Sequence, residues 1–278
     1  MSFPPEAFLI GAQKAGTTYL ANLLAQHPDV CLAHPKEPDF FTQNRDKGLD
    51  WYRQRFAEPN ATVLLDASTS YTACPLQAHD PPELIRSSRF SGVPQRIREV
   101  SPDARFVYLL RDPVARTYSA YWHEVRAGNE ARPFREAIEA DGYYLRVSDY
   151  RGQLTHYLEY FARESLLLLR FEDLVREPLA VARRTLEFLG VDAGPELRVS
   201  VGANRSFTYG PGIAGLNRAL SPLGGIAGVV KRSRRVIPSA VFRAAGKMIT
   251  RKIPEIREED RRFIQSRLGN DIDLLTDH

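Results

Sequence analysis

Cysteine is scarce in this sequence, and long apolar runs are absent from it. The 278 residues include two cysteines, Cys31 and Cys74, which are too few for a disulfide framework or a cysteine-based zinc site. This scarcity fits a reducing compartment, so we expect a cytoplasmic protein. No run of about 18 apolar residues occurs, and no transmembrane helix is therefore predicted. The first residues, MSFPP, lack the basic and apolar regions of a signal peptide, so none is expected.

Charge of one sign is only in slight excess. The formal net charge is +4, and Lys and Arg gather at 231–235 and 243–252. A solvated surface accounts for such runs, while an anionic substrate or peripheral membrane contact through 231–252 are the functional alternatives. The basic residues do not interleave with aromatic ones and no nucleic-acid-binding motif occurs, so nucleic acid is not an expected partner.

Apolar runs of strand length alternate with helical patterns along most of the chain. The strand-like runs are 7–11, 62–66, 105–110 and 165–170. The helical patterns are 17–26, 93–100, 113–127, 133–140, 147–162 and 178–190. This alternation predicts an α/β fold, with a central parallel β-sheet flanked by helices. In such a fold the ligand site lies at the carboxyl ends of the strands.

The last quarter of the chain has a different pattern. Residues 202–226 are rich in glycine and are predicted to form a loop, 227–253 are basic and amphipathic, and a final helix is predicted over 255–275. We expect a single domain with an α/β core over 1–210 and a C-terminal loop and helical extension over 211–278.

The segment FLIGAQKAGTT, residues 8–18, carries the most informative motif. It reads as a buried strand, a turn over small residues and the start of a helix. Such a turn directs unpaired N–H groups and the positive end of the helix dipole toward one spot, which binds phosphate. Small residues let the backbone approach the anion, the lysine adds a charge, and the threonines add hydroxyls. The residues assigned to the anion are Gly11, Lys14, Ala15, Gly16, Thr17 and Thr18.

The spacing of this motif differs from that of an ATP- or GTP-binding P-loop. That loop reads GxxxxGK[ST], with the lysine after the last glycine. Here the order is GxxKAGTT, with Lys14 before Gly16. The difference argues against a kinase with a variant P-loop, which stays as an alternative together with an ordinary strand-to-helix turn.

A second polar cluster follows the apolar run 105–110. Arg111 ends this run, and Pro113 stands near the first position of a helix in which Ser119 lies about two turns further on. Arg111 is a candidate for binding an anion, and an ion pair with Asp112 or another surface acid is the alternative. Arg116 is expected at the surface.

Several blocks of the sequence resemble the motifs of one family. They are QKAGTTYL (13–20), HPDV (27–30), PKEPDFF (35–41), LLDASTSY (64–71), ARFVYLLRDPVARTYSAYWH (104–123), YRGQL (150–154) and LLLLRFEDL (166–174). With them the chain resembles the sulfotransferases that use 3′-phosphoadenosine 5′-phosphosulfate (PAPS). The branch that it resembles contains the heparan sulfate sulfotransferases and their bacterial relatives. The resemblance covers about residues 7 to 210 and implies a P-loop-like α/β fold.

The resemblance implies where the sulfuryl donor PAPS and its product, adenosine 3′,5′-bisphosphate (PAP), bind. Residues Lys14 to Thr18 hold the 5′-phosphosulfate, and Lys14 stabilises the leaving group. Arg111 and Ser119 bind the 3′-phosphate, which distinguishes PAPS from ATP and suits an arginine fork. Arg205, in the glycine-rich segment, is a further candidate for the nucleotide. No metal is expected, because a sulfuryl group carries less charge than a phosphoryl group.

The resemblance also implies a catalytic base. Glu37 matches the catalytic glutamate of the family and can take the proton of an acceptor hydroxyl. His123 lies one helical turn after Ser119 and either shares or replaces this role or is structural. Two positions depart from the O-sulfotransferase pattern, since Ala67 stands where some members have a lysine and Asp39 where they have a histidine. Both departures weaken the case for a heavily sulfated glycan acceptor.

The sequence therefore predicts a PAPS-dependent sulfotransferase that acts on a hydroxyl or amine of a glycan, lipid or secondary metabolite. A non-catalytic nucleotide-binding protein is the alternative from another class. The segment 213–253 combines apolar residues with the basic run 231–235. We expect it to cover the acceptor side of the site.

Overall fold

The computed structural model describes residues 3–192, 196–199, 207–209 and 250–268. Its centre is a five-stranded sheet with the strand order β2-β3-β1-β4-β5, in which all neighbours are parallel. The strands are β1 (Ala7–Gly11), β2 (Val30–Leu32), β3 (Val63–Asp66), β4 (Arg105–Leu110) and β5 (Leu166–Arg170). The predicted α/β fold with a central parallel sheet is confirmed.

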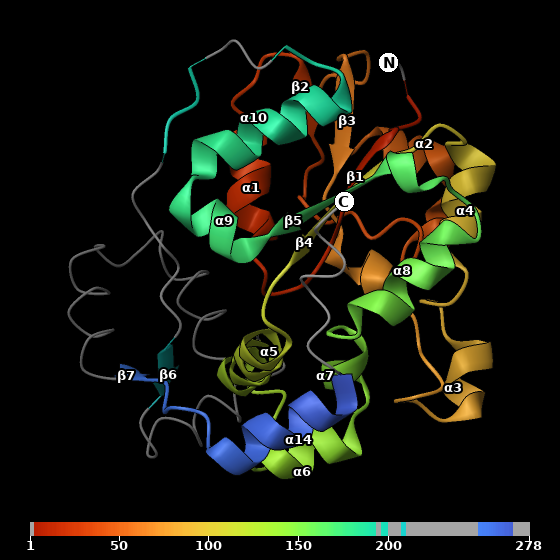
Figure 1. Cartoon of the computed structure of the whole chain (residues 1–278). Helices are drawn as coiled ribbons and strands as arrows, with labels where there is room; N and C mark the ends of the chain where they lie inside the picture. Colours follow the sequence, from red (N-terminus) through yellow and green to blue (C-terminus); the bar gives the residue numbers. More distant parts are fainter. Residues whose placement is uncertain (1–2, 193–195, 200–206, 210–249, 269–278) are drawn as a thin grey trace, which may run out of the picture.

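Helices cover both faces of the sheet (Figure 1). The helices α1 (Thr17–Leu24), α9 (Phe171–Arg176) and α10 (Pro178–Leu189) lie on one face. The helices α2 (Gly48–Arg53), α4 (Val93–Val100) and α8 (Tyr150–Leu158) lie on the other. The sheet is thus the middle of three layers, which explains why its strands are almost continuously apolar.

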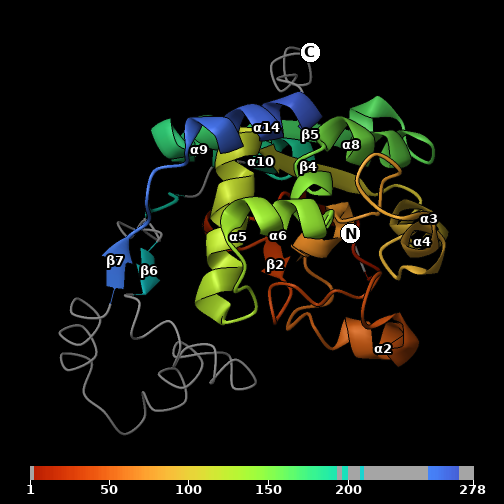
Figure 2. The ribbon, with the colours of Figure 1, turned by 90° about the horizontal axis from the view of Figure 1, so that it is seen from below.

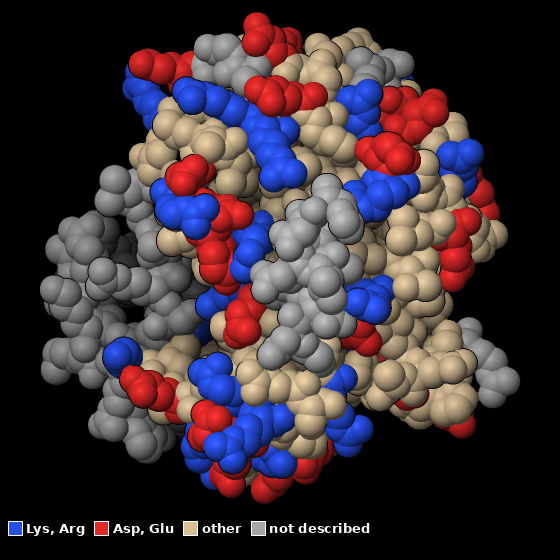
Figure 3. Space-filling model, viewed as in Figure 1, with Lys and Arg blue, Asp and Glu red and all other residues tan. Residues whose placement is uncertain are grey.

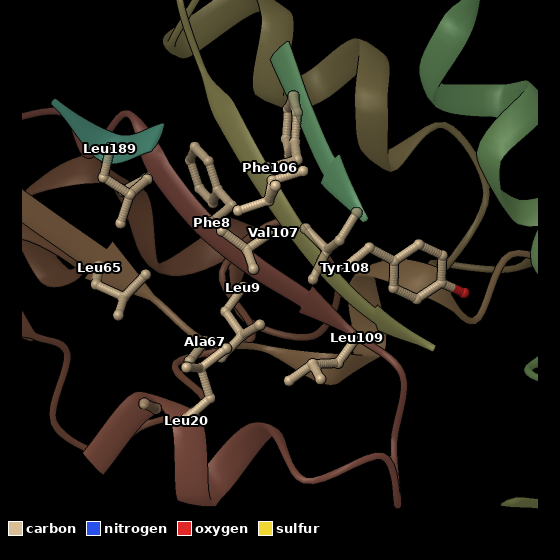
Figure 4. Close-up of a cluster of buried hydrophobic side chains, with 14 of the residues drawn as sticks. Phe8, Leu9, Leu20, Leu65, Ala67, Phe106, Val107, Tyr108, Leu109 and Leu189 are labelled. Atoms are coloured by element: carbon tan, nitrogen blue, oxygen red, sulfur yellow. The ribbon is translucent and has the colours of Figure 1, made fainter. Parts of the chain in front are cut away.

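Alternating side chains of the strands form the main core on both faces of the sheet (Figure 4). Leu9 and Leu109 point toward Leu20 of α1. Phe8 and Phe106 stack on the opposite face with ring centroids 5.7 Å apart. This alternation is the period-two pattern of a strand, and it leaves the carboxyl ends of β1, β3 and β4 free to carry polar residues.

A second, smaller hydrophobic cluster lies beyond the carboxyl edge of the sheet. It joins α5 (Pro113–Ala127), α6 (Phe134–Ala140), α7 (Tyr143–Arg146) and α14 (Glu258–Leu268). Figure 2 shows these helices together, seen from below. Asp112 caps α5 by accepting the Ala115 N–H at 2.7 Å, and Asp149 caps α8 through the Gly152 N–H at 2.9 Å, as expected of helix N-caps. The Asp112 cap therefore fixes where α5 begins.

Short elements differ from the predicted pattern. The strand β2, the helices α2, α3 (Pro82–Ser87), α7 and α9, and the 3₁₀-helices η1 (Arg45–Lys47), η2 (Thr69–Thr72) and η3 (Arg163–Ser165) were not predicted. The prediction of a loop over 202–226 is wrong at β6 (Phe207–Tyr209), which pairs antiparallel with β7 (Thr250–Lys252) and lies against α5. Elements of three to six residues are too short to show a period.

The described part of the chain contains no helix that combines the length and apolarity needed to cross a membrane. Much of the predicted C-terminal extension, including the basic run 231–235, lies outside the described residues, and so does Arg205. On the face drawn in Figure 3, Lys and Arg side chains of the described residues are interspersed with Asp and Glu.

Candidate active site

The loop between β1 and α1 has the backbone of an anion cradle. Lys14 has a φ of 70° and Gly16 a φ of 91°, so the chain passes twice through the left-handed region. A Cβ at Gly16 would lie 3.1 Å from Phe171 and 3.2 Å from Leu174, which is why only glycine fits this close approach. Gly16 is also the N-cap of α1 and offers no side chain to it. The first N–H groups of α1 are therefore available to a ligand.

The predicted ligands at the start of α1 differ in exposure. Thr17 is buried and Thr18 is exposed, while the Ala15 side chain is fully buried in the core. Of these three residues, Thr18 presents its hydroxyl to solvent, and Ala15 contributes through its backbone.

Arg111 joins the end of β4 to this loop. One guanidinium nitrogen, Nη1, donates to the carbonyl oxygen of Lys14 at 2.9 Å, and the guanidinium lies 4.6 Å from the centroid of the Phe171 ring. The Tyr150 hydroxyl donates to the Arg111 carbonyl oxygen at 2.7 Å and accepts from its N–H at 3.3 Å. Asp112 is occupied as the cap of α5. Arg111 is thus held in place by both its side chain and its backbone.

Arg111 and Ser119 line one groove, and their assignment to the 3′-phosphate stays a prediction. The groove has a volume of about 410 Å³, and its opposite wall is the segment Ile253–Ile256 with Arg261 of α14. The Tyr118 hydroxyl donates to the Pro254 carbonyl oxygen at 2.9 Å and ties the two walls together. Sequence reasoning missed this opposite wall, because residues more than a hundred positions apart give no local signal.

Lys14 and His123 meet at the end of the anion cradle. The Lys14 ammonium lies 3.4 Å from Nδ1 of His123. Burial, followed by the positive charge of Arg126, lowers the pKa of Lys14 to about 8. Burial and then the charge of Lys14 lower the pKa of His123. The charge of Glu37 acts weakly on both groups in the opposite direction.

Both carboxylate oxygens of Glu37 have partners. The Lys36 ammonium lies 2.8 Å from Oε1, and the Thr69 hydroxyl donates to Oε2 at 3.0 Å. The Glu37 side chain is 37% exposed, so the carboxylate is held yet open to an acceptor. Neither Lys36 nor Thr69 was predicted as a site residue, because the contact of each with Glu37 appears only in the structure.

The two departures from the family pattern have a structural counterpart. Ala67 is fully buried, and its side chain points toward Leu20 in the core (Figure 4). Its carbonyl oxygen accepts a hydrogen bond from Lys36 Nζ at 3.0 Å. An ammonium therefore lies beside the Glu37 carboxylate although position 67 is not a lysine. Asp39 accepts a hydrogen bond from the Ser70 hydroxyl at 2.6 Å, and burial raises its pKa.

Arg116 is fully buried, so the expectation of a surface residue is wrong. Its guanidinium donates to the Ser148 hydroxyl and to the Tyr144 carbonyl oxygen. Arg116 faces the second hydrophobic cluster rather than solvent, and it fastens α5 to α7. Its role is to fix the helix that carries Ser119 and His123.

Within the described residues, no group of three or more His, Cys, Asp or Glu side chains is placed to hold a metal ion. The expectation of a metal-free reaction stays a prediction.

The protein thus has an α/β fold in which the β1–α1 loop lies next to a groove that is lined by Arg111 and Arg261 together with Asp112 and Glu255. A model of the sulfotransferase family matches residues 5–195. The match covers more than half of the chain, and the chain therefore belongs to the sulfotransferase family. The resemblance inferred from the sequence motifs is confirmed.

Two kinds of curated relative are similar to the same part of the chain. Human heparan sulfate glucosamine 3-O-sulfotransferase 3B1 is 27% identical over 197 residues, which are 67% of this chain and 46% of the relative. Human bifunctional heparan sulfate N-deacetylase/N-sulfotransferase 3 is 27% identical over 216 residues, covering 67% of this chain and 22% of the relative. This chain thus spans about half the length, or less, of these relatives.

A solved structure extends the likeness over more of the chain. The sulfotransferase from Alicyclobacillus acidocaldarius is 28% identical, with a TM-score of 0.55, and the superposition covers 86% of this chain and 98% of that one. Its coverage passes beyond residue 195, where the family match ends.

Proposed function

We propose that this protein transfers the sulfuryl group of PAPS to a hydroxyl or amine of an acceptor. The observation that carries the proposal is the contact of Lys14 with His123 in the β1–α1 loop, whose Lys14 carbonyl oxygen accepts a hydrogen bond from Arg111 in a groove that Ser119 also lines. This arrangement supplies separate positions for two phosphates and for a base. Membership of the sulfotransferase family supports the same reaction.

The residues fit the donor at both of its phosphate groups. The N–H groups at the start of α1 and the Lys14 ammonium suit the 5′-phosphosulfate. Arg111 and Ser119 suit the 3′-phosphate, and the Arg261 side chain adds a cation to the same groove. ATP lacks a 3′-phosphate and would place no anion in this groove.

Glu37 or His123 takes the proton of the acceptor as the acceptor oxygen or nitrogen bonds to sulfur. The bond between sulfur and the bridging oxygen breaks, and its electron pair stays on that oxygen as part of PAP. The Lys14 ammonium holds the negative charge that develops there. Burial and the charge of Lys14 favour the neutral form of His123, which would have to release the Lys14 ammonium before Nδ1 accepted a proton.

The acceptor class rests on the relatives. One is named for sulfating an oxygen of heparan sulfate and the other for sulfating a nitrogen, which supports a hydroxyl or an amine as the accepting group. A glycan, lipid or small-molecule acceptor is proposed. The cytoplasmic location and the cover formed by 213–253 stay predictions.

Labelled PAPS and a panel of glycan, lipid and phenolic acceptors test this function directly. We expect labelled product with at least one acceptor, and loss of transfer in Lys14→Ala. Calorimetry with PAP and ATP provides the binding control. A protein that binds ATP as tightly as PAP, and transfers label to no acceptor, would contradict the proposal.

A further inference from the structure

Glu37 is joined by both of its oxygens to residues outside the predicted catalytic set. Thr69 donates to Oε2 at 3.0 Å, and the Lys36 ammonium lies 2.8 Å from Oε1. Each carboxylate oxygen has two lone pairs, so one on each oxygen stays open to an acceptor. Glu37 can therefore receive a proton without giving up either partner.

Thr69 is itself held by a buried polar cluster. It is 7% exposed and begins η2, directly after β3 ends at Asp66. The Ser68 N–H and hydroxyl donate to Asp66 Oδ1 at 3.0 and 2.6 Å. The hydroxyls of Tyr52 and Tyr71 donate to Asp66 Oδ2 at 2.6 and 2.7 Å. Asp66 is fully buried, so the start of η2 has one fixed position.

The segment that carries Glu37 is fastened to the same residues. The Asp39 N–H donates to the Ser68 hydroxyl at 3.0 Å, and the Ser70 hydroxyl donates to Asp39 Oδ1 at 2.6 Å. Lys36 Nζ donates to the Ala67 carbonyl oxygen at 3.0 Å while it contacts Glu37. The backbone around Glu37 and its carboxylate are thus aligned by one segment, 67–70.

We propose that Thr69 and Lys36 are positioning residues that hold the Glu37 carboxylate in the orientation needed to take the acceptor proton. The inference rests on the proposed function. A glutamate side chain has several rotamers, and ordering it costs entropy in each turnover unless the fold has already fixed it. A reacting group displaced by about 1 Å can lose about 100-fold in rate. Thr69 and Lys36 prevent that displacement from opposite sides.

Kinetics of Thr69→Val and Thr69→Ser test the hydroxyl. The valine keeps the shape of threonine and removes the donor, so we expect kcat to fall about 10- to 100-fold. The KM for PAPS and the Kd for PAP are expected to stay within about twofold of wild type. Serine restores the donor and is expected to restore most of kcat. Thr185→Val is the matched control, because Thr185 is fully buried and donates to Val181 within α10.

Lys36→Met tests the second partner, and thermal unfolding of the variant checks that loss of the bond to the Ala67 carbonyl oxygen leaves the fold intact. We expect the same loss of kcat with unchanged PAP affinity. Lys47→Met is its control, since the Lys47 ammonium lies over the Trp51 ring, 4.6 Å from its centroid. Equal kcat in Lys36→Met and wild type would remove Lys36 from the proposal.

A double variant decides whether Thr69 acts through Glu37. In a Glu37→Gln background, Thr69→Val is expected to cause no further loss of kcat. A further loss of tenfold, or a serine variant as slow as the valine variant, would overturn the proposal. A wild-type protein without transfer activity would overturn the proposed function and this inference together. Normal transfer by Thr69→Val, with Glu37→Gln inactive, would overturn the inference alone.

Discussion

The Lys14 ammonium and the His123 ring share one hydrogen bond, with Nζ 3.4 Å from Nδ1. An ammonium can only donate, so Nδ1 of His123 is the acceptor and the ring proton lies on Nε2. Burial and the charge of Lys14 lower the pKa of His123. The pair therefore carries a single positive charge at neutral pH, and that charge resides on Lys14.

Activity is expected to fall at alkaline pH. The pKa of Lys14 is lowered to about 8, so the ammonium that stabilises the leaving group is present below this pH and is lost above it. The ratio kcat/KM for PAPS reports the free enzyme and is expected to decline as the pH rises through about 8. Lys14→Arg keeps its charge at high pH, so its profile is expected to stay flat there. An unchanged alkaline decline in Lys14→Arg would assign the decline to another group.

Removal of the Arg111 side chain is expected to weaken PAP binding more than AMP binding. A charge-assisted hydrogen bond to a phosphate contributes about 1.5 to 3 kcal/mol, so the preference for PAP is expected to drop at least about tenfold in Arg111→Ala. Ser119→Ala is expected to give a smaller loss of the same kind. Calorimetry with PAP and AMP measures both effects. Arg176→Ala is the control, because Arg176 pairs with Asp173 and Glu177 on α9. Equal losses for PAP and AMP would mean that Arg111 acts only by holding the Lys14 carbonyl.

Two single substitutions separate the candidate bases. Glu37→Gln is expected to lower kcat by about two to four orders of magnitude, the usual contribution of a general base, while PAP affinity stays near that of wild type. His123→Asn is expected to lower kcat less. Steady-state kinetics and PAP calorimetry check both. The reverse order of losses would transfer the role of base to His123.

Asp66 is expected to titrate at an unusually high pH. Burial raises its pKa from 3.8 to about 6, although the hydrogen bonds from Ser68, Tyr52 and Tyr71 oppose the shift. A carboxyl with a raised pKa binds protons more tightly in the folded chain. Its contribution to the free energy of unfolding is therefore largest below pH 3.8 and is lost as the pH rises through about 6.

An NMR titration of the Asp66 carboxyl carbon measures this pKa. Tyr52→Phe removes one of the donors that stabilise the carboxylate, so the midpoint is expected to move to still higher pH. A midpoint near 3.8 in wild type would show that hydrogen bonding outweighs burial at this site. A lower midpoint in Tyr52→Phe would show that the Tyr52 hydroxyl does not stabilise the carboxylate.

The long elements were predictable because their patterns are local. The buried runs of β1, β4 and β5, and the capped helix α5, carry their signals within a few neighbouring residues. Lys14, Glu37, Arg111 and Ser119 were found through motifs, and the structure brings them to one edge of the sheet. Their chemical roles stay predictions.

The residues that hold Glu37 could not be predicted in the same way. Thr69 is 32 positions away from Glu37. It contacts the carboxylate only because β3 and η2 place it beside Glu37 in the fold. Arg116 was misplaced for a similar reason, since an arginine in a helix gives no sign of a second cluster on its inner side. Tyr118 and Pro254 are separated by 136 positions, and their contact depends on how the last segment returns to α5.

The groove beside Arg111 is lined by two stretches that lie far apart in the sequence. The sulfotransferase match ends at residue 195, yet Ile253–Ile256 and Arg261 form one wall of the groove. A shortened chain that kept every matched residue would retain the sheet, the cradle and Glu37 but would expose Arg111 and Ser119 on an open surface. Substitutions at 253–256 or at Arg261 can therefore change the shape and charge of this groove while every residue of the family match stays the same.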